Sequence, residues 1–197
     1  MTDCADCPRA QTKARSRWVA PKRDVQLSGI LNVDKPPGMT SHDVVDEVRR
    51  IVGQRKVGHA GTLDPMATGV LLVCLGKATR VAEYLMKGRK RYRATIVLGM
   101  TTDTYDAEGE IVSSGGKADF ASDEIEAALA RFVGRIEQVP PMYSAIKQQG
   151  RPLYELARQG KTVERSPRPV EIDTIELLHW TPPALCIEVA CSPGTYI

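Results

Sequence analysis

The sequence predicts an α+β fold with a mixed or mostly antiparallel central sheet flanked by helices. Strand and helix patterns are interspersed along the 197 residues, without the regular alternation that produces a parallel sheet. Hydrophobic residues make up 42% of the chain and charged residues 26%, which is enough apolar material to bury a core. We therefore expect a globular chain of one full-sized domain, or two small ones at most.

The N-terminal residues 1–27 are polar and basic and lack apolar periodicity, so we expect a flexible arm there. The arm has no apolar signal segment, and the longest apolar run of the chain, residues 70–75, is too short to span a membrane. We therefore expect a cytoplasmic protein with no membrane partner. Cys4 and Cys7 form one C-x-x-C pair without a second pair at zinc spacing, so no metal site is expected.

The first regular elements are a strand and a helix. A short apolar strand pattern and a Pro-Gly turn occupy residues 29–38. Thr40 with Asp43 resembles a capping box for the helix that follows, although Ser41 is an equally good cap, and Gly53 ends the helix. The apolar face of this helix consists of residues that recur at helical spacing, namely Val44, Val45, Val48, Ile51 and Val52.

The middle of the chain alternates between strand and helix signals. Residues 56–63 are typical of an extended segment or loop, residues 68–75 of a buried strand and residues 78–85 of a short helix. Period-two alternation of apolar residues with basic or polar ones predicts a strand over residues 91–98.

The C-terminal half begins with an acidic, turn-rich connection. Apolar residues at helical spacing over residues 125–133 predict a second helix, which Gly134 closes. Residues 140–169 are rich in Pro and Arg and are typical of a long functional loop with a short helix near residues 153–158. Two strands near residues 172–178 and 185–191 complete the chain.

Charge is segregated along the chain, although the net charge is only +3. Five cations and no acid lie within residues 87–93, and a second basic region covers residues 147–168. The acidic stretch 103–126 lies between them. This pattern fits a basic face for a polyanion with an acidic face turned away from it, although ordinary solvated faces would produce the same pattern.

Several generic catalytic signatures fail. The Gly160-Lys161-Thr162 segment resembles the end of a P-loop, but Glu155 stands where that motif requires Gly. The segment 59–69 remains, and it places the carboxylate of Asp64 on a Gly- and Pro-shaped turn before a buried strand. From these residues alone, an Asp before Pro is more typical of a turn former than of a catalyst.

Six motifs, in order, resemble those of the TruB-type tRNA pseudouridine synthases. They are Gly-Ile-Leu-Asn-Val-Asp-Lys-Pro-Pro-Gly-Met-Thr-Ser at 29–41, His-Ala-Gly-Thr-Leu-Asp-Pro-Met-Ala-Thr-Gly at 59–69, Lys-Arg-Tyr at 90–92, Gly-Met-Thr-Thr-Asp-Thr-Tyr-Asp-Ala-Glu-Gly at 99–109, Pro-Met-Tyr-Ser-Ala at 141–145 and Gly-Thr-Tyr-Ile at 194–197. The resemblance implies a pseudouridine synthase fold, with a partial catalytic domain over residues 28–197 and an RNA-gripping insertion near residues 141–169.

The resemblance assigns roles to four residues. Asp64 falls on the catalytic aspartate, which attacks the target nucleoside while uracil is released, turned and rejoined through carbon instead of nitrogen. This covalent chemistry requires neither a metal nor an organic cofactor. Tyr92 falls on the tyrosine that stacks against the target base, Tyr196 on a second active-site tyrosine, and His59 on a histidine associated with flipping the uridine out of its loop. Without the resemblance, Tyr92, Tyr196 and His59 would be interpreted as structural residues.

The implied partner is the T stem-loop of tRNA, bound by a monomer. Cations beside Tyr92 and in the insertion are expected to hold its phosphates, namely Lys90, Arg91, Arg93, Lys147 and Arg151. The implied activity is an isomerase that converts uridine to pseudouridine in that loop. Two alternatives stay open: a non-catalytic tRNA-binding or tRNA-folding module of the same fold, and a guide-RNA-dependent relative that needs partner proteins.

The sequence departs from the family at its end. The family motif continues after Ile197 with an arginine that pairs with the catalytic aspartate. We therefore expect a sheet that is incomplete at the C-terminus, no C-terminal RNA-binding domain, and a raised pKa for Asp64 in the absence of that counter-charge.

Overall fold

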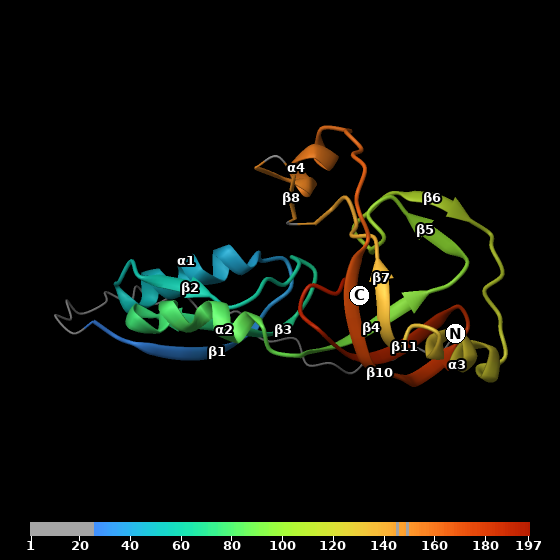
Figure 1. The fold of residues 1–197 in the computed structure, drawn as a ribbon, viewed down its shortest axis with the longest axis horizontal. Helices are drawn as coiled ribbons and strands as arrows, with labels where there is room; N and C mark the ends of the chain where they lie inside the picture. Colours follow the sequence, from blue (N-terminus) through green and yellow to red (C-terminus); the bar gives the residue numbers. More distant parts are fainter. Residues whose placement is uncertain (1–25, 145, 149) are drawn as a thin grey trace, which may run out of the picture.

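The computed structural model describes residues 26–144, 146–148 and 150–197. Within these residues the strands form two main sheets, of three and four strands, and two short hairpins (Figure 1). Every pair of described strands is antiparallel, so the predicted α+β class with an antiparallel sheet is confirmed, although the strands divide between two sheets. The Cys4–Cys7 pair and residues 1–25 of the predicted arm lie outside the described residues.

The first sheet has the order β1-β3-β2, with β1 at Gly29–Lys35, β3 at Gly69–Leu75 and β2 at Val57–His59. Helix α1, Ser41–Val52, covers one face of it (Figure 1). The core between helix and sheet consists of Val44, Val45, Val48, Val57, Leu71, Val73 and Leu75. Leu27 packs against this core, so the end of the predicted arm belongs to the folded part.

Helix α1 confirms the predicted boundaries. Thr40 is its N-cap, because the Asp43 N–H donates to Thr40 Oγ1 (3.1 Å) and the Thr40 N–H donates to Asp43 Oδ2 (2.8 Å). Gly53 ends the helix with a left-handed φ of 67°, which glycine adopts without steric cost. The side chain of Ile51, predicted to be in the core, is 60% exposed, because Ile51 lies at the edge of the apolar stripe centred near Val48.

The chain then crosses to the second sheet through two short helical turns. The single helix predicted over residues 78–85 is a 3₁₀ helix, η1 at Gly76–Val81, followed by α2 at Ala82–Met86. The Thr79 hydroxyl donates to the carbonyl of Gly76 (2.9 Å) within η1, and such a side-chain bond to the preceding turn competes with regular α-helix.

The second sheet has the order β4-β11-β10-β7. Its strands are β4 at Lys90–Val97, β11 at Ala184–Cys191, β10 at Arg168–Thr181 and β7 at Gly134–Gln138. Strand β10 is longer than predicted because β7 pairs with its first residues and β11 with the rest. Helix α3, Ser122–Ala130, packs on this sheet through Ile125. Gly134, predicted to end a helix, starts β7.

Two hairpins occupy segments that were predicted to be loops. Strands β5, Met100–Thr102, and β6, Ile111–Ser114, form one of them. The other pairs β8, Lys147–Gln148, with β9, Arg151–Pro152, and leads into α4, Leu153–Arg158, the helix predicted in the insertion. This second hairpin and α4 stand apart from both sheets (Figure 1). Among the described helices, none is long and apolar enough to cross a membrane.

Candidate active site

Hydrogen bonds fix the backbone on both sides of Asp64, which lies in the loop between β2 and β3. Ser41 Oγ donates to the carbonyl of Leu63 (3.2 Å), and the Leu63 N–H donates to Ser41 Oγ (2.9 Å). The Ala67 N–H donates to the carbonyl of Asp64 (3.1 Å), which closes a turn with Pro65 at its second position. The Asp64 side chain is therefore presented from a defined backbone rather than from a mobile loop.

Lys35 also holds this loop in place, and its side chain is fully buried. Its ammonium donates to the carbonyls of Pro36 (3.0 Å), Met39 (2.8 Å) and Pro65 (3.1 Å). The Pro65 carbonyl also accepts from the Gly38 N–H (2.8 Å). A buried ammonium is tolerated when all its donors are used, and here it joins the turn after β1 to the loop that carries the carboxylate. Lys35 belongs to the first of the six motifs, but the resemblance gave this lysine no role.

The pKa of Asp64 is raised above its ordinary value. Partial burial is the largest cause, the nearby carboxylate of Asp106 adds to it, and the ammonium of Lys35 opposes it. The side chain still reaches solvent, and no described residue donates a hydrogen bond to its carboxylate. The expected direction of the shift is confirmed, and one of its causes was missed: Asp106 belongs to the acidic stretch that was predicted to face away from the site.

Tyr92, on β4 of the second sheet, lies within electrostatic reach of Asp64, in a loop of the first sheet. Burial raises the pKa of the Tyr92 phenol, and the charges of Cys191 and Asp64 raise it further, so the carboxylate lies within electrostatic reach of the ring. The ring is half-buried and packs against the core of the second sheet. The structure therefore brings together two of the residues that the motifs singled out.

The cations next to Tyr92 divide between the two faces of β4, because successive side chains of a strand point in opposite directions. Lys90 shares the face of Tyr92. Arg91 and Arg93 lie on the other face, where both pair with Glu188 on β11, at 3.1 and 3.3 Å. Arg91 and Arg93 thus lie on the face of β4 opposite the Tyr92 ring, and their expected role in holding phosphates stays a prediction.

His59 and Tyr196 have no described contact with Asp64. His59 ends β2, and its Nδ1 atom is buried without a hydrogen-bond partner among the described residues. Tyr196 is fixed through its backbone: its N–H donates to Gln138 Oε1 (3.0 Å), and Gln138 Nε2 donates to its carbonyl (2.7 Å). These contacts place the C-terminal segment against the end of β7, and the roles predicted for both side chains stay predictions.

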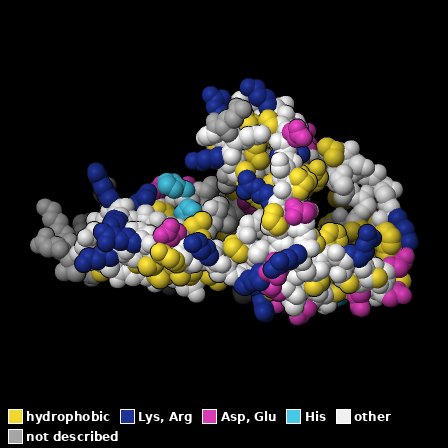
Figure 2. Space-filling model, in the orientation of Figure 1, with side chains coloured by type: hydrophobic (Ala, Val, Ile, Leu, Met, Phe, Trp, Pro, Cys, Tyr) yellow, Lys and Arg dark blue, Asp and Glu magenta, His cyan; other side chains and the backbone are white. Residues whose placement is uncertain are grey.

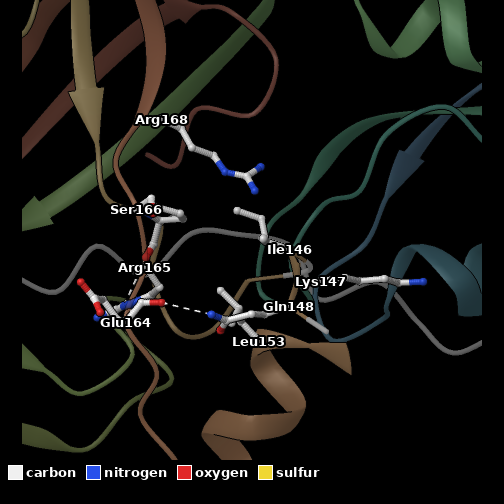
Figure 3. A pocket seen from close by; sticks show the side chains of 9 residues that line it. Ile146, Lys147, Gln148, Leu153, Glu164, Arg165, Ser166 and Arg168 are labelled. Atoms are coloured by element: carbon white, nitrogen blue, oxygen red, sulfur yellow. Dashed lines mark hydrogen bonds between the residues drawn. The ribbon is translucent and has the colours of Figure 1, made fainter. Parts of the chain in front are cut away.

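The insertion carries a basic pocket beside the β8–β9 hairpin. Three of its lining side chains are cations, Lys147, Arg165 and Arg168, against one acid, Glu164. Figure 3 shows the guanidinium of Arg168 directed into it, and Gln148 Nε2 donating to the carbonyl of Glu164 (3.4 Å).

Surface charges of both signs are distributed unevenly over the molecule. Lys and Arg side chains lie over the first sheet and around the hairpin and α4, but also over the second sheet, where they mix with Asp and Glu; acids gather around α3 (Figure 2). The expected division into a basic and an acidic face is therefore only partial on this side of the molecule, since cations of the second sheet pair with Glu188 and Glu171.

Comparison with known protein families shows to which family this chain belongs. The family described as "TruB family pseudouridylate synthase (N terminal domain)" matches residues 49–197. The chain belongs to the TruB family.

Curated TruB-family relatives match most of the chain. The tRNA pseudouridine synthase B of Syntrophotalea carbinolica is 53% identical over 171 residues, which cover 87% of this chain and 56% of the relative. The enzyme of the same name from Symbiobacterium thermophilum is 50% identical over 192 residues, which cover 96% of this chain and 61% of the relative. The chain thus spans between half and two thirds of the length of these relatives.

Solved structures agree with the TruB-family assignment. A chain in the crystal structure of a Cbf5-Nop10-Gar1 complex is 33% identical with a TM-score of 0.64, and the match covers 94% of this chain and 47% of that one. A chain in the structure of an H/ACA RNP bound to a substrate RNA containing 2'-deoxyuridine is 30% identical with a TM-score of 0.60, and the match covers 85% of this chain and 39% of that one.

Proposed function

We propose that this chain isomerises uridine to pseudouridine in the T loop of tRNA, with Asp64 as the nucleophile. The observation that carries the proposal is the setting of Asp64. Its carboxyl group has a raised pKa and lies within electrostatic reach of the half-buried Tyr92 ring, and hydrogen bonds hold the backbones of its neighbours Leu63 and Pro65. Relatives 50% to 53% identical to this chain, named tRNA pseudouridine synthase B, support tRNA as the substrate.

The reaction rearranges bonds within one nucleoside. The Asp64 carboxylate attacks the target nucleoside as the bond between C1′ and N1 breaks. The freed uracil turns and forms a bond from its C5 to C1′, while the bond to Asp64 is released. The proton on C5 leaves and N1 takes one up, so the product has the same composition as the substrate and no electrons are exchanged.

The aromatic and imidazole groups hold the base in this proposal. Tyr92 offers a ring face against which the target uracil stacks, as single-stranded RNA bases do on aromatic side chains. Tyr196 supplies a second surface for the base. His59 assists the movement of the uridine out of its loop, which the enzyme must unstack to reach it.

The remaining expectations about partners follow from the same proposal. The partner is the T stem-loop of tRNA, bound by a monomer through Lys90, Lys147 and Arg151, and the reaction takes place in the cytoplasm without a metal or organic cofactor. Arg91 and Arg93 are also proposed to hold RNA phosphates, because both side chains stay exposed beside Glu188 and keep further N–H donors for a phosphate.

Product formation on an unmodified tRNA transcript tests the function. The chain is incubated with the transcript, and pseudouridine is measured by mass spectrometry of the digested RNA. A transcript with cytidine at the target position is the control and forms no product. Tight, salt-sensitive binding without product would favour the tRNA-binding module instead, and product that forms only when a guide RNA and partner proteins are added would favour the guide-dependent relatives.

Replacing Asp106 with Asn is expected to shift the acid limb of the activity profile to lower pH. The carboxylate form of Asp64 is the nucleophile, so activity falls as the pH drops through the pKa of Asp64. Removing the negative charge of Asp106 lowers that pKa. Asn keeps the Oδ1 atom that accepts from Thr104 Oγ1 (2.6 Å) and the Glu108 N–H (2.9 Å), so the loop stays folded. The measurement is kcat/KM as a function of pH.

Asp103→Asn is the matched control for this profile. Asp103 lies in the same loop, and its Oδ1 accepts from the Glu110 N–H (2.9 Å), but it is not among the charges that shift the pKa of Asp64. An acid limb that stays in place in Asp106→Asn, or moves equally in both variants, contradicts the assignment.

Replacing Lys147 and Arg151 with Ala is expected to weaken RNA binding and reduce its salt dependence. Removing one cation that pairs with a phosphate lowers the slope of log K against log salt concentration by about 1. Arg131→Ala, an exposed cation that ends α3 on the second sheet, is the matched control and leaves the slope unchanged. Binding of a T stem-loop RNA is measured by fluorescence anisotropy at several salt concentrations, and an unchanged slope in the double variant removes the hairpin from the RNA interface.

A further inference from the structure

Tyr105 has an unusual combination of backbone and exposure. Its φ of 64° makes it the only non-glycine residue with positive φ among the described residues. For a bulky side chain this left-handed conformation costs free energy, and glycine or asparagine would adopt it more readily. Its side chain is also 75% exposed, so packing within the chain does not account for an aromatic residue here.

Hydrogen bonds hold the Tyr105 backbone in this conformation. The Tyr105 N–H donates to the carbonyl of Thr102 (3.3 Å), and Thr102 Oγ1 donates to the carbonyl of Asp106 (2.7 Å). Asp106 Oδ1 in turn accepts from Thr104 Oγ1 (2.6 Å) and from the Glu108 N–H (2.9 Å). The residues on both sides of Tyr105 are therefore tied to each other, and the exposed ring is carried by a rigid turn.

The two ends of the turn are also joined. The Asp103 N–H donates to the carbonyl of Glu110 (3.1 Å), and the Glu110 N–H donates to Asp103 Oδ1 (2.9 Å). Gly109 lies so close to Asp103 and Thr104 that a Cβ atom there would overlap their side chains. The turn is thus a compact unit at the end of the β5–β6 hairpin.

Asp106, the neighbour of Tyr105 in this rigid turn, lies within electrostatic reach of Asp64. The bases that flank a uridine held at Asp64 would then have the turn, and the exposed Tyr105 ring that it carries, within reach. Strained backbone of this kind persists where the surrounding structure enforces it, and it is characteristic of functional sites.

We propose that Tyr105 binds substrate, by stacking its exposed ring against an unpaired RNA base that flanks the target uridine. An exposed aromatic ring on a rigid support is the feature with which proteins bind single-stranded bases, because every base offers a π face. This inference rests on the proposed function, since it takes an RNA loop at Asp64 as its starting point.

Tyr105→Gly tests the proposal without endangering the fold, because glycine adopts the positive φ more readily than tyrosine does. The variant is expected to bind a T stem-loop RNA about tenfold more weakly, the scale of removing one base stack. The slope of its affinity against salt concentration stays that of the wild type, since every cation that pairs with a phosphate is still present. Tyr105→Phe keeps the ring and binds as the wild type does, and the kcat of both variants at saturating RNA is unchanged.

A fluorescent base reports the stack directly. T stem-loop RNAs carry 2-aminopurine on either side of the target uridine, and one of them is expected to be quenched on binding to the wild type and to Tyr105→Phe but not to Tyr105→Gly. Tyr84→Ala, on α2, is the matched control: Tyr84 is 65% exposed, and its removal leaves binding and quenching unchanged.

The outcomes separate this inference from the function on which it rests. If the wild type neither binds the RNA nor forms pseudouridine, the proposed function fails. If the wild type does both and Tyr105→Gly matches it in affinity and quenching, only the role of Tyr105 is overturned. A thermal unfolding temperature below that of the wild type would mean that the side chain is structural, and Tyr105→Asn, which also tolerates positive φ, repeats the test.

Discussion

Asp64→Asn is expected to reduce pseudouridine formation by at least about a thousandfold, the scale seen when a covalent nucleophile is removed. An amide has the shape of the carboxylate but does not attack the nucleoside. The hydrogen bonds that hold the loop are made by the backbones of Leu63 and Pro65, so the substitution leaves these bonds in place. Binding of the T stem-loop RNA is therefore retained.

Stability provides a second readout for Asp64→Asn. The pKa of Asp64 is raised in the folded state, which means that the fold disfavours the ionised carboxylate. At pH values above that pKa, the charge of Asp64 therefore lowers the free energy of unfolding. Removing the charge should leave the unfolding temperature at neutral pH equal to or above that of the wild type. The loss of activity then cannot be attributed to unfolding.

The control is Asp34→Asn, an exposed carboxylate at the end of β1 that retains full activity. Product formation that persists in Asp64→Asn would eliminate the proposed mechanism. Product formation that disappears together with RNA binding would instead indicate a damaged binding surface.

Lys35→Met is expected to lower the free energy of unfolding by about 3 kcal/mol. Methionine has similar length and fills the buried space, but it leaves the carbonyls of Pro36 and Met39 without the ammonium that donates to them. Pro65 keeps only the N–H of Gly38 as a donor. Urea denaturation followed by circular dichroism measures the destabilisation.

Activity in Lys35→Met should change beyond its effect on stability. The ammonium lowers the pKa of Asp64, so its removal raises that pKa, and the acid limb of the activity profile moves to higher pH, opposite to the shift in Asp106→Asn. Lys56→Met, an exposed lysine between α1 and β2, is the control and is expected to change neither quantity. A Lys35→Met protein as stable as the wild type would refute the role of the buried ammonium.

Local patterns were sufficient for most of the regular elements. The spacing of Val44, Val45 and Val48 predicted α1, and period-two alternation predicted β4, because these periodicities follow from the geometry of one element. Strand β7 and the two hairpins were missed. Their strands are short and mostly exposed, and their residues become strands only through pairing with partners.

The residues of the candidate site were also predicted only in part from the sequence. Asp64 and Tyr92 were named from motifs, and the structure places them within electrostatic reach of each other. Lys35 and Asp106 were not assigned roles, because no spacing rule indicates that a lysine at the end of β1 reaches the carbonyl of Pro65, or that an acidic hairpin turn approaches Asp64.

By itself, the sequence determined the fold class, the family resemblance and the candidate nucleophile, since periodicity and ordered motifs are properties of consecutive residues. Only the tertiary structure decided which groups surround Asp64 and which cations share a face with Tyr92. It also showed that Arg91 and Arg93 pair with Glu188 on the opposite face of β4. The physical reason is that burial and charge interactions depend on distances between segments remote in the chain, which exist only once the two sheets have formed.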